Sequence, residues 1–299
     1  MNILITGGSG FIGRNLVEGL KDKYKIYSPS HKQLDLLNYK KVNSYIKKNK
    51  IKIVIHTAIK GGEDVFYTTM RMFTSILYSI DRLDKFIHIG SGAEYSKTRG
   101  IKKIKEKDFG RFIPEDGYGF AKYLCSKISE NNKKIFTLRL FGIYGKYEDY
   151  RYKFIANSIV KNLLKQPIKI KQNVVFDYIY VDDFVKIVDY FIKKTPKHNF
   201  YNISPTKSIS LIELAKIINK VSNYKSKISI ANKGFNYQYT AHNERLLKEI
   251  ENLKFISYEE GILKLYSYYS NMFEKLDRSA IIKDEYFLKS KIKNANKKT

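Results

Sequence analysis

Cysteine and tryptophan are nearly absent from this sequence, which holds one cysteine and no tryptophan among 299 residues. A single cysteine cannot form an intramolecular disulfide, and no Cys-x-x-Cys pair or His/Cys cluster offers the ligands of a zinc site. We therefore expect a reducing environment and no metal.

Long apolar runs are also missing. No stretch approaches the roughly 18 apolar residues of a membrane-spanning helix, and the first residues, MNILITGG, lack the basic segment and apolar core of a signal peptide. The 43% hydrophobic and 14% aromatic residues exclude a disordered chain. These features predict a cytoplasmic globular protein with no membrane partner.

Acidic residues are scarce relative to basic ones: 29 Asp and Glu stand against 56 Lys and Arg, a net charge of +27. Such an excess raises the hypothesis of an anionic partner, such as nucleic acid, a membrane surface or a phosphorylated substrate. The lysines are spread through the whole chain, however, and define no separate nucleic-acid face. We expect no nucleic-acid partner, and a positive surface that speeds the capture of polyanionic ligands at low salt.

The first half of the chain alternates short apolar runs with amphipathic stretches. The apolar runs predict strands at 2–5, 24–27, 51–56, 85–89 and 134–140. The amphipathic stretches predict helices at 11–21, 39–49, 63–82 and 118–131. This alternation predicts a parallel sheet with helices on both faces, because parallel strands need crossover connections.

The second half is less regular and predicts a smaller α/β domain. Helical patterns at 151–165, 182–194 and 210–222 are mixed with β-rich pieces at 174–181 and 199–203.

A glycine-rich segment joins the first predicted strand to the first predicted helix. Strand NILI runs into Thr-Gly-Gly-Ser-Gly-Phe-Ile-Gly, and a helical pattern follows from Phe11; the segment supplies the candidate cofactor residues Gly7, Gly10, Phe11, Ile12 and Gly13. Glycines allow a tight turn and close backbone approach, so a pyrophosphate can sit on the helix N-terminus, where N–H groups and the helix dipole favour an anion. The strand, turn and helix in this order predict a dinucleotide site.

The residues after the second predicted strand bear on the choice of cofactor. An NAD site usually has an acidic residue there for the ribose hydroxyls, but this chain has Ser28, Pro29, Ser30, His31 and Lys32. Hydroxyl and basic side chains can bind a 2′-phosphate. This segment therefore favours NADPH over NAD(H) as the cofactor. The alternative is that His31 and Lys32 are ordinary solvated loop residues.

Two further motifs, together with the glycine loop, make the chain resemble the extended short-chain dehydrogenase/reductase family of nucleotide-sugar-modifying enzymes. The first is Tyr118-Gly-Phe-Ala-Lys122, which matches the family's YxxxK; the spacing of four puts both side chains on one helix face. The second is Ser91-Gly-Ala-Glu-Tyr95, which is similar to the family's SxxxY segment. The resemblance covers residues 1–270. It implies a Rossmann-type doubly wound parallel sheet with a smaller C-terminal α/β substrate domain.

The resemblance implies roles for particular residues. Ser91 orients the reacting oxygen, Tyr118 exchanges its proton, and Lys122 holds the ribose. A nearby ammonium is expected to lower the pKa of the Tyr118 phenol from its usual value near 10. Further implied contacts are Asp35 and Leu36 with the adenine, Thr57, Ala58 and Ile59 with the cofactor phosphates and riboses, and Phe141 and Ile143 with the nicotinamide.

Departures from the family's motifs exclude some activities. Dehydratases carry Thr-Asp-Glu where this chain has Ser91, Gly92 and Ala93, so the acid and base that eliminate water are missing. The loop LDLLN resembles GDP-fucose synthase-like 4-keto-sugar reductases, but their epimerising Cys and His are replaced by Ala93 and Tyr147. We expect no C3/C5 epimerisation.

Substrate contacts are expected from two segments. Gly92 and Ala93 are assigned to the substrate together with Ser91. Because Phe176 replaces the family's usual arginine, Lys146, Tyr147 and Arg151 are the candidates for the sugar-nucleotide pyrophosphate.

These observations predict three regions: a dinucleotide-binding domain over 1–165, a substrate domain over 166–270 from which some chain returns to the first, and a basic, loosely docked tail over 271–299. The first functional hypothesis is NADPH-dependent C4 reduction of a nucleoside-diphosphate-4-keto sugar, with GDP favoured, in surface-polysaccharide synthesis. The alternatives are an NAD-dependent 4-epimerase and, outside catalysis, a dinucleotide-sensing or nucleic-acid-binding module. A homodimer is the family-based expectation.

Overall fold

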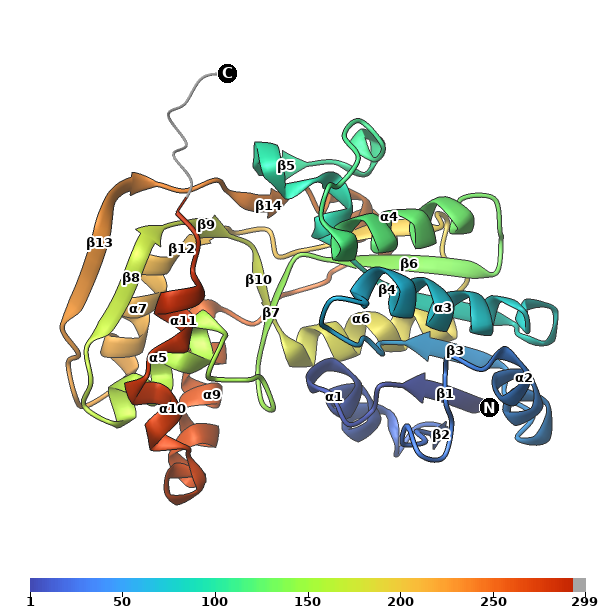
Figure 1. Ribbon diagram of the computed structural model, residues 1–299, viewed down its shortest axis with the longest axis horizontal. Coiled ribbons are helices and arrows are strands. Elements are labelled where there is room, and N and C mark those ends of the chain that lie inside the picture. Colours follow the sequence, from blue (N-terminus) through green and yellow to red (C-terminus); the bar gives the residue numbers. More distant parts are fainter. Residues whose placement is uncertain (293–299) are drawn as a thin grey trace. The chain divides into compact units, whose positions relative to one another are not determined.

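The computed structural model describes residues 1–292 and divides the chain into two compact units. The first unit comprises 1–141, 184–204 and 241–253. The second unit comprises 142–183, 205–240 and, of the described residues, 254–292. The chain therefore returns to the first unit twice after leaving it, and each unit is described separately below (Figure 1).

A six-stranded parallel sheet forms the centre of the first unit, in the order β2-β1-β3-β4-β6-β11. Its strands are β1 (Asn2–Thr6), β2 (Lys25–Tyr27), β3 (Ile53–His56), β4 (Lys85–Ser91), β6 (Ile135–Leu140) and β11 (Phe200–Ile203). The order reverses at β1, which has β2 on one side and β3 on the other. The carboxyl ends of β1 and β3 are therefore the topological switch point, the place where such sheets bind ligands.

Helices cover both faces of this sheet. On one face α2 (Tyr39–Lys48), α3 (Val65–Leu77) and α4 (Gly117–Ser129) lie side by side (Figure 1). Their apolar side chains, among them Phe73 and Ile76, form one buried cluster with Leu4, Val54 and Phe86 of the strands. The other face carries α1 (Phe11–Leu20) and α6 (Val181–Lys193), which approach so closely that a Cβ on Gly19 would lie 2.6 Å from Val185. This arrangement confirms the predicted doubly wound α/β sheet.

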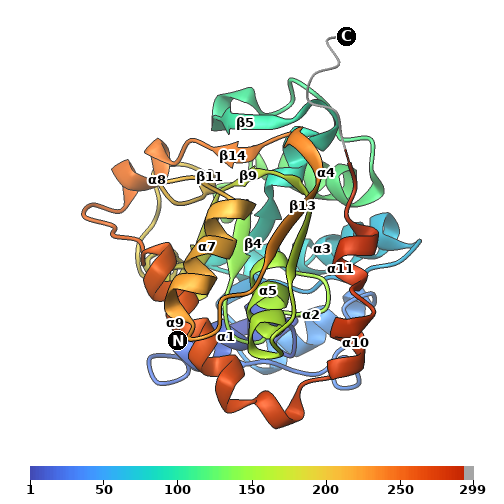
Figure 2. The same ribbon diagram turned by 90° about the vertical axis from the view of Figure 1, so that its left-hand side faces the viewer.

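The second unit is built from short strand pairs and helices. The pairs β7 (Gly142–Tyr144) with β10 (Tyr178–Tyr180) and β8 (Ile168–Asn173) with β13 (Ile228–Phe235) are parallel. Strand β9 (Val175–Phe176) pairs antiparallel with β12 (Ile209–Ser210) and parallel with β14 (Tyr239–Ala241). Three helices pack on one another (Figure 2): α5 (Phe154–Leu163), α7 (Leu211–Val221) and α9 (Tyr258–Asn271).

Several elements differ from the sequence prediction. The helix expected over 63–82 ends at Leu77 and is followed by a separate 3₁₀ turn, Ile80–Arg82. The second unit begins at 142 rather than 166. The region expected as a tail from 271 contains α10 (Arg278–Ile282) and α11 (Glu285–Lys289), whereas 293–299 lie outside the described residues.

Other elements had no counterpart in the prediction: β5 (Ile101–Ile104) and α8 (Glu244–Glu249) in the first unit, and β13 and α9 in the second. No helix within residues 1–292 is long and apolar enough to cross a membrane.

Because of the core cluster of the first unit, we expect two Ile→Ala substitutions to differ strongly in their effect on the free energy of unfolding. Ile76→Ala removes a fully buried side chain and should lower the free energy of unfolding by about 2–5 kcal/mol. Ile113→Ala acts at a residue that is 56% exposed, and should change it by less than about 0.5 kcal/mol. Urea unfolding followed by circular dichroism measures both, and equal losses would contradict this packing.

Candidate functional site

The glycine loop brings β1 and α1 into close backbone contact. Gly7 has a φ of +71°, and its carbonyl accepts the N–H of Gly10 at 3.0 Å. A Cβ on Gly13 would lie 2.2 Å from the Gly7 carbonyl oxygen, closer than any real contact. Both positions thus require glycine for steric reasons, as the sequence motif predicts.

The N-terminus of α1 has no side-chain cap. Its N-cap residue is Gly10, and Phe11 and Ile12 begin the helix, so no side-chain oxygen accepts the first backbone N–H groups. An uncapped N-terminus behind a loop of glycines fits the pyrophosphate of a dinucleotide, whose oxygens would accept those N–H groups.

The ends of β2 and β3 adjoin this loop. A Cβ on Gly8 would lie 1.8 Å from Ser28 Oγ, and one on Gly7 would lie 2.7 Å from Ala58 Cα. The Thr57 hydroxyl donates to the carbonyl of Thr6 at 2.6 Å, which ties β3 to β1 directly below the loop. The structure therefore brings Ser28, Thr57 and Ala58 to the glycine loop.

The remaining residues predicted for the adenosine half have more varied surroundings. His31 and Lys32 are exposed, as is Ile59 at 52%. Asp35 accepts the backbone N–H of Leu37 at 3.0 Å, so in this structure one of its oxygens stabilises the turn. Leu36 packs partly buried against the core cluster of the first unit.

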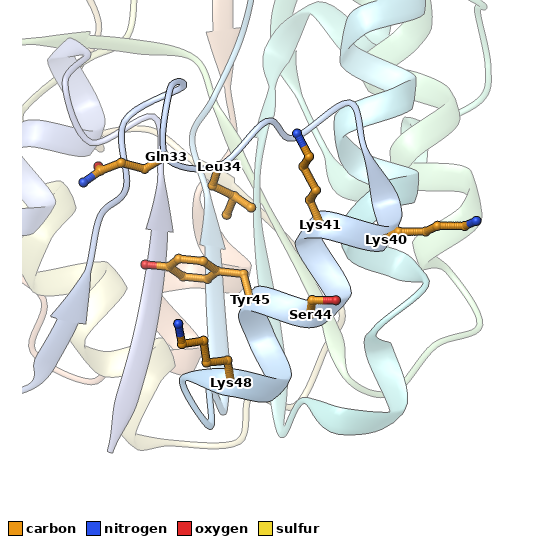
Figure 3. A pocket seen from close by; sticks show the side chains of 7 residues that line it. All are labelled: Gln33, Leu34, Lys40, Lys41, Ser44, Tyr45 and Lys48. Atoms are coloured by element: carbon orange, nitrogen blue, oxygen red, sulfur yellow. The ribbon is translucent and has the colours of Figure 1, made fainter.

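A hollow of about 370 Å³ lies beside this segment, between the turn before α2 and α2 itself (Figure 3). The residues that line it come from the turn before α2 and from α2 itself: Gln33, Leu34, Lys40, Lys41, Ser44, Tyr45 and Lys48. Its lysines were not among the predicted cofactor residues. The hollow contains none of the predicted residues, so it neighbours the predicted adenosine site without coinciding with it.

Ser91, Tyr118 and Lys122 come together at the carboxyl end of β4. Ser91 is the last residue of β4, and its Oγ accepts the N–H of Ala93 at 3.1 Å, which leaves its own proton available for donation. Tyr118 lies in the first turn of α4, where the Ser91 hydroxyl acts on the pKa of its phenol. One turn later, the buried Lys122 amine donates to the carbonyl of Ile89 at 2.7 Å.

Burial changes the expected titration of these groups. Desolvation raises the pKa of Tyr118, despite the opposing hydrogen bond from Ser91, and the nearby carboxylates of Glu94 and Asp116 raise it further. Burial also lowers the pKa of the Lys122 amine. The prediction that an ammonium lowers the pKa of Tyr118 is therefore wrong for this structure, because the loss of water is the larger effect.

Two buried groups beside this site have structural roles. His56 shares a 2.8 Å hydrogen bond with the Thr6 hydroxyl, and complete burial lowers its pKa to about 3. Cys125 is fully buried, with Sγ 3.8 Å from Met70 Sδ, and burial raises its pKa to about 12. Both side chains are therefore core residues of the first unit.

The residues predicted for the substrate are divided between the units. Gly92 and Ala93 are buried in the 3₁₀ turn after Ser91, in the first unit. Phe141 ends the first unit. The other residues predicted for nicotinamide and substrate belong to the second unit: Ile143, Lys146, Tyr147 and Arg151.

Arg151 is engaged locally in this structure. Its guanidinium makes a two-pronged ion pair with Asp149, at 2.9 and 2.7 Å, on the exposed loop after β7. Tyr147 has a φ of +72° and packs edge-on against Tyr268. No group of His, Cys, Asp or Glu side chains that could hold a metal occurs in the part of the chain that the structure describes.

Sequence reasoning missed two charged residues next to the site, Glu94 and Arg139. Their side chains are fully buried and form an ion pair at 2.7 Å. A signal was present in the strand IFTLRL, because an arginine in an otherwise apolar, buried strand needs a buried partner.

Residues 3–204 match the sequence pattern of the NAD dependent epimerase/dehydratase family. The chain belongs to this family. The match covers the glycine loop, Ser91 and the Tyr118/Lys122 pair, and it agrees with the resemblance noted from the sequence.

Individual relatives are distant. The chain is 24% identical to an ADP-L-glycero-D-manno-heptose-6-epimerase of Brachyspira hyodysenteriae, over 75% of this chain and 81% of the relative. It is 24% identical to a GDP-L-colitose synthase of Yersinia pseudotuberculosis, over 91% and 98%. The fold matches the NADP-bound GDP-mannoheptose C4 reductase of Campylobacter jejuni with a TM-score of 0.77 and 20% identity, over 90% and 98%.

The loop geometry predicts that Gly13→Ala disrupts dinucleotide binding. The added methyl would displace the Gly7 carbonyl and widen the loop. The affinity for NAD(P)H should therefore fall about tenfold or more, which corresponds to a loss of about 1.4 kcal/mol of binding free energy. The matched control is Gly61→Ala, whose added Cβ meets nothing within 4 Å. Fluorescence titration measures both affinities, with thermal melts to check folding. Unchanged binding by folded Gly13→Ala would refute the assignment.

Proposed function

We propose that this chain is an NADPH-dependent reductase that converts the 4-keto group of a nucleoside-diphosphate sugar to a hydroxyl. The observation that carries the proposal is the placement of Ser91 at the carboxyl end of β4, with Tyr118 in the first turn of α4 and Lys122 one turn further along that helix. Two hydroxyls at this position suit a carbonyl oxygen that gains negative charge as it is reduced.

The burial of Tyr118 suits it to donate a proton. Because desolvation raises its pKa, the phenol keeps its proton at neutral pH, and a developing alkoxide is basic enough to take it. Ser91 would donate its hydroxyl proton to the same oxygen once substrate is bound, while its Oγ still accepts the N–H of Ala93. Lys122 would contact the cofactor ribose.

When bound, NADPH supplies the hydride. In the proposal, the glycine loop and the N-terminus of α1 hold its pyrophosphate. The 2′-phosphate is held by Ser28, His31 and Lys32. The adjoining phosphate and ribose groups are contacted by Thr57, Ala58 and Ile59. Asp35 and Leu36 take the adenine side, and Phe141 and Ile143 the nicotinamide. The absence of an acidic side chain between Ser28 and Lys32 supports NADP(H) over NAD(H).

The choice of substrate rests on the family and on the departures from its motifs. Similar proteins are named for GDP- and ADP-linked sugars, and one similar structure is a C4 reductase with NADP bound. We favour a GDP-linked sugar, with Gly92, Ala93, Lys146, Tyr147 and Arg151 as its contacts and the second unit as the substrate domain. Gly92 and Ala93 cannot supply the acid and base of a dehydratase. The proposed setting is the cytoplasm, as a homodimer, in the synthesis of surface polysaccharide.

Tyr118→Phe is predicted to abolish most turnover. Loss of the proton donor should lower kcat for NADPH oxidation by about 10²–10⁴-fold. The affinity for NADPH should remain within about threefold, since the phenol is proposed to act on the reacting oxygen. The measurement is absorbance at 340 nm with a panel of GDP-, CDP-, dTDP- and UDP-linked 4-keto sugars, together with a binding titration.

Three outcomes would overturn the proposal. Undiminished activity of Tyr118→Phe would refute the mechanism. Tightly bound NAD in the purified wild-type protein, with interconversion of C4 epimers and no NADPH oxidation, would identify a 4-epimerase that uses the same three side chains. Dinucleotide binding without turnover on any sugar would favour a dinucleotide-sensing module.

Lys32→Ala tests the proposed 2′-phosphate site. Losing one hydrogen bond from a charged group, worth about 1.5 kcal/mol, should weaken NADPH binding about tenfold and leave NADH unchanged, because NADH lacks that phosphate. The control is Lys133→Ala, at an exposed lysine before the amino end of β6, away from the carboxyl ends of the parallel strands. Equal effects on NADPH and NADH would contradict the NADP assignment.

A further inference from the structure

The carboxylate of Glu94 connects the strand, the turn and the helix that carry the proposed catalytic groups. One oxygen accepts the backbone N–H of Ser91 at 2.8 Å. The other accepts the hydroxyl of Ser126 at 2.6 Å and the guanidinium Nε of Arg139 at 2.7 Å. Ser126 lies one turn after Lys122 on α4, and Arg139 lies on β6 next to β4. A single side chain therefore joins the ends of β4, α4 and β6.

Arg139 balances this buried charge and is itself held tightly. Its guanidinium carbon lies 3.8 Å from the ring centre of Phe109 and 4.7 Å from that of Phe200. A second guanidinium nitrogen donates to the Tyr95 hydroxyl at 3.1 Å, and that hydroxyl donates to Asn202 at 2.7 Å. These contacts fix the orientation of the guanidinium. The guanidinium in turn restricts the orientation of the Glu94 carboxylate that it binds.

The backbone makes room for this carboxylate. A Cβ on Gly90 would lie 2.4 Å from a Glu94 carboxylate oxygen. Glycine at the next-to-last position of β4 therefore lets the carboxylate sit beneath Ser91. Burying such a pair adds little or no net stability compared with apolar side chains, because both charges lose their water. A role in holding the site accounts for the pair better than stability does.

We propose that Glu94 is a positioning residue for reduction: its carboxylate fixes Ser91 against Tyr118 by binding the Ser91 backbone and the helix that carries Tyr118. This inference rests on the proposed function. The Glu94 charge has a second consequence, because it raises the pKa of both Tyr118 and Lys122 and so favours the protonated forms.

Other charges also face Tyr118 and must be kept constant in a test. Asp116 at the N-cap of α4 acts on its pKa in the same direction as Glu94. The Lys97 amine lies 5.9 Å from the Tyr118 ring centre, and Lys122 follows on the same helix. Facing Glu94 itself are Arg139 and Tyr95 from the network, and Lys122 and Cys125 from α4.

The test is Glu94→Gln, which is close in shape but lacks the charge and one acceptor oxygen. Because Ser91 loses its fixed position, kcat should fall about tenfold or more. KM and the affinity for NADPH should stay within about threefold. With the negative charge gone, Tyr118 ionises more easily, so the alkaline limb of the kcat–pH profile should move to lower pH.

The matched control is Glu106→Gln. Glu106 is also a buried carboxylate of the first unit, but it accepts the backbone N–H of Asn202 at 2.9 Å and is not hydrogen-bonded to Ser91 or Ser126. The same substitution there should leave the pH profile in place. If Glu94→Gln and Glu106→Gln give the same kcat and the same profile, Glu94 is only structural and the proposal fails.

A second variant covers the case in which Glu94→Gln alone is unstable, since it leaves Arg139 buried without its anion. Glu94→Gln combined with Arg139→Met removes both charges and should recover the melting temperature while keeping the lowered kcat and the shifted profile. Recovery of kcat and profile together with stability would overturn the proposal. Absence of NADPH oxidation by the wild-type protein would instead count against the proposed function.

Discussion

The common direction of the six strands in the first unit is the constraint on which the candidate site depends. Parallel strands end at the same edge of a sheet, so the turns after β1, β2, β3 and β4 meet there although the sequence separates them widely. Through this geometry the glycine loop, Ser28, Thr57 and Ser91 belong to one edge. Crossover helices then follow from the strands, because a parallel sheet must be covered on both faces. Of these helices, α1 and α4 bring their N-terminal turns to the same edge.

Local chemistry at this edge is governed by the exclusion of water. Burial raises the pKa of Tyr118 and lowers that of Lys122, so each group is shifted toward its neutral form. The Glu94 carboxylate offsets this shift for Lys122 and adds to it for Tyr118. A buried anion can remain there only because Arg139, Ser126 and the Ser91 backbone satisfy it. The hydrogen bonds that stabilise the buried charge of Glu94 also hold Ser91 in place. One carboxylate therefore affects both the stability of the fold and the position of a proposed catalytic residue.

The sequence predicted the first unit well; in the second unit it predicted α5, α7 and the β-rich piece at 174–181 but missed β8, β13 and α9, for a physical reason. Strands such as β1 and β4 are buried on both faces and appear as apolar runs, and α1 and α2 show clear amphipathic periodicity. Strand β12 has only two residues and carries no periodicity, while β13 is mostly exposed. The split of the chain into interleaved units likewise depends on contacts between distant segments. Ser91, Tyr118 and Lys122 could be proposed from the sequence because short local motifs contain them; Glu94 and Arg139 were missed because their pairing joins residues 45 positions apart.

The sequence by itself determined the fold class, the glycine loop, the family resemblance and the three proposed catalytic side chains, since each depends on patterns spanning a few neighbouring residues. Only the tertiary structure decided the titration of those side chains and the partners that hold them. The pKa of Tyr118 depends on how much water is removed around it, and that is set by packing against α4, β4 and their neighbours. The role inferred for Glu94 could not be read from the sequence, because it depends on the contacts of its carboxylate with β4, α4 and β6, which form only in the folded chain.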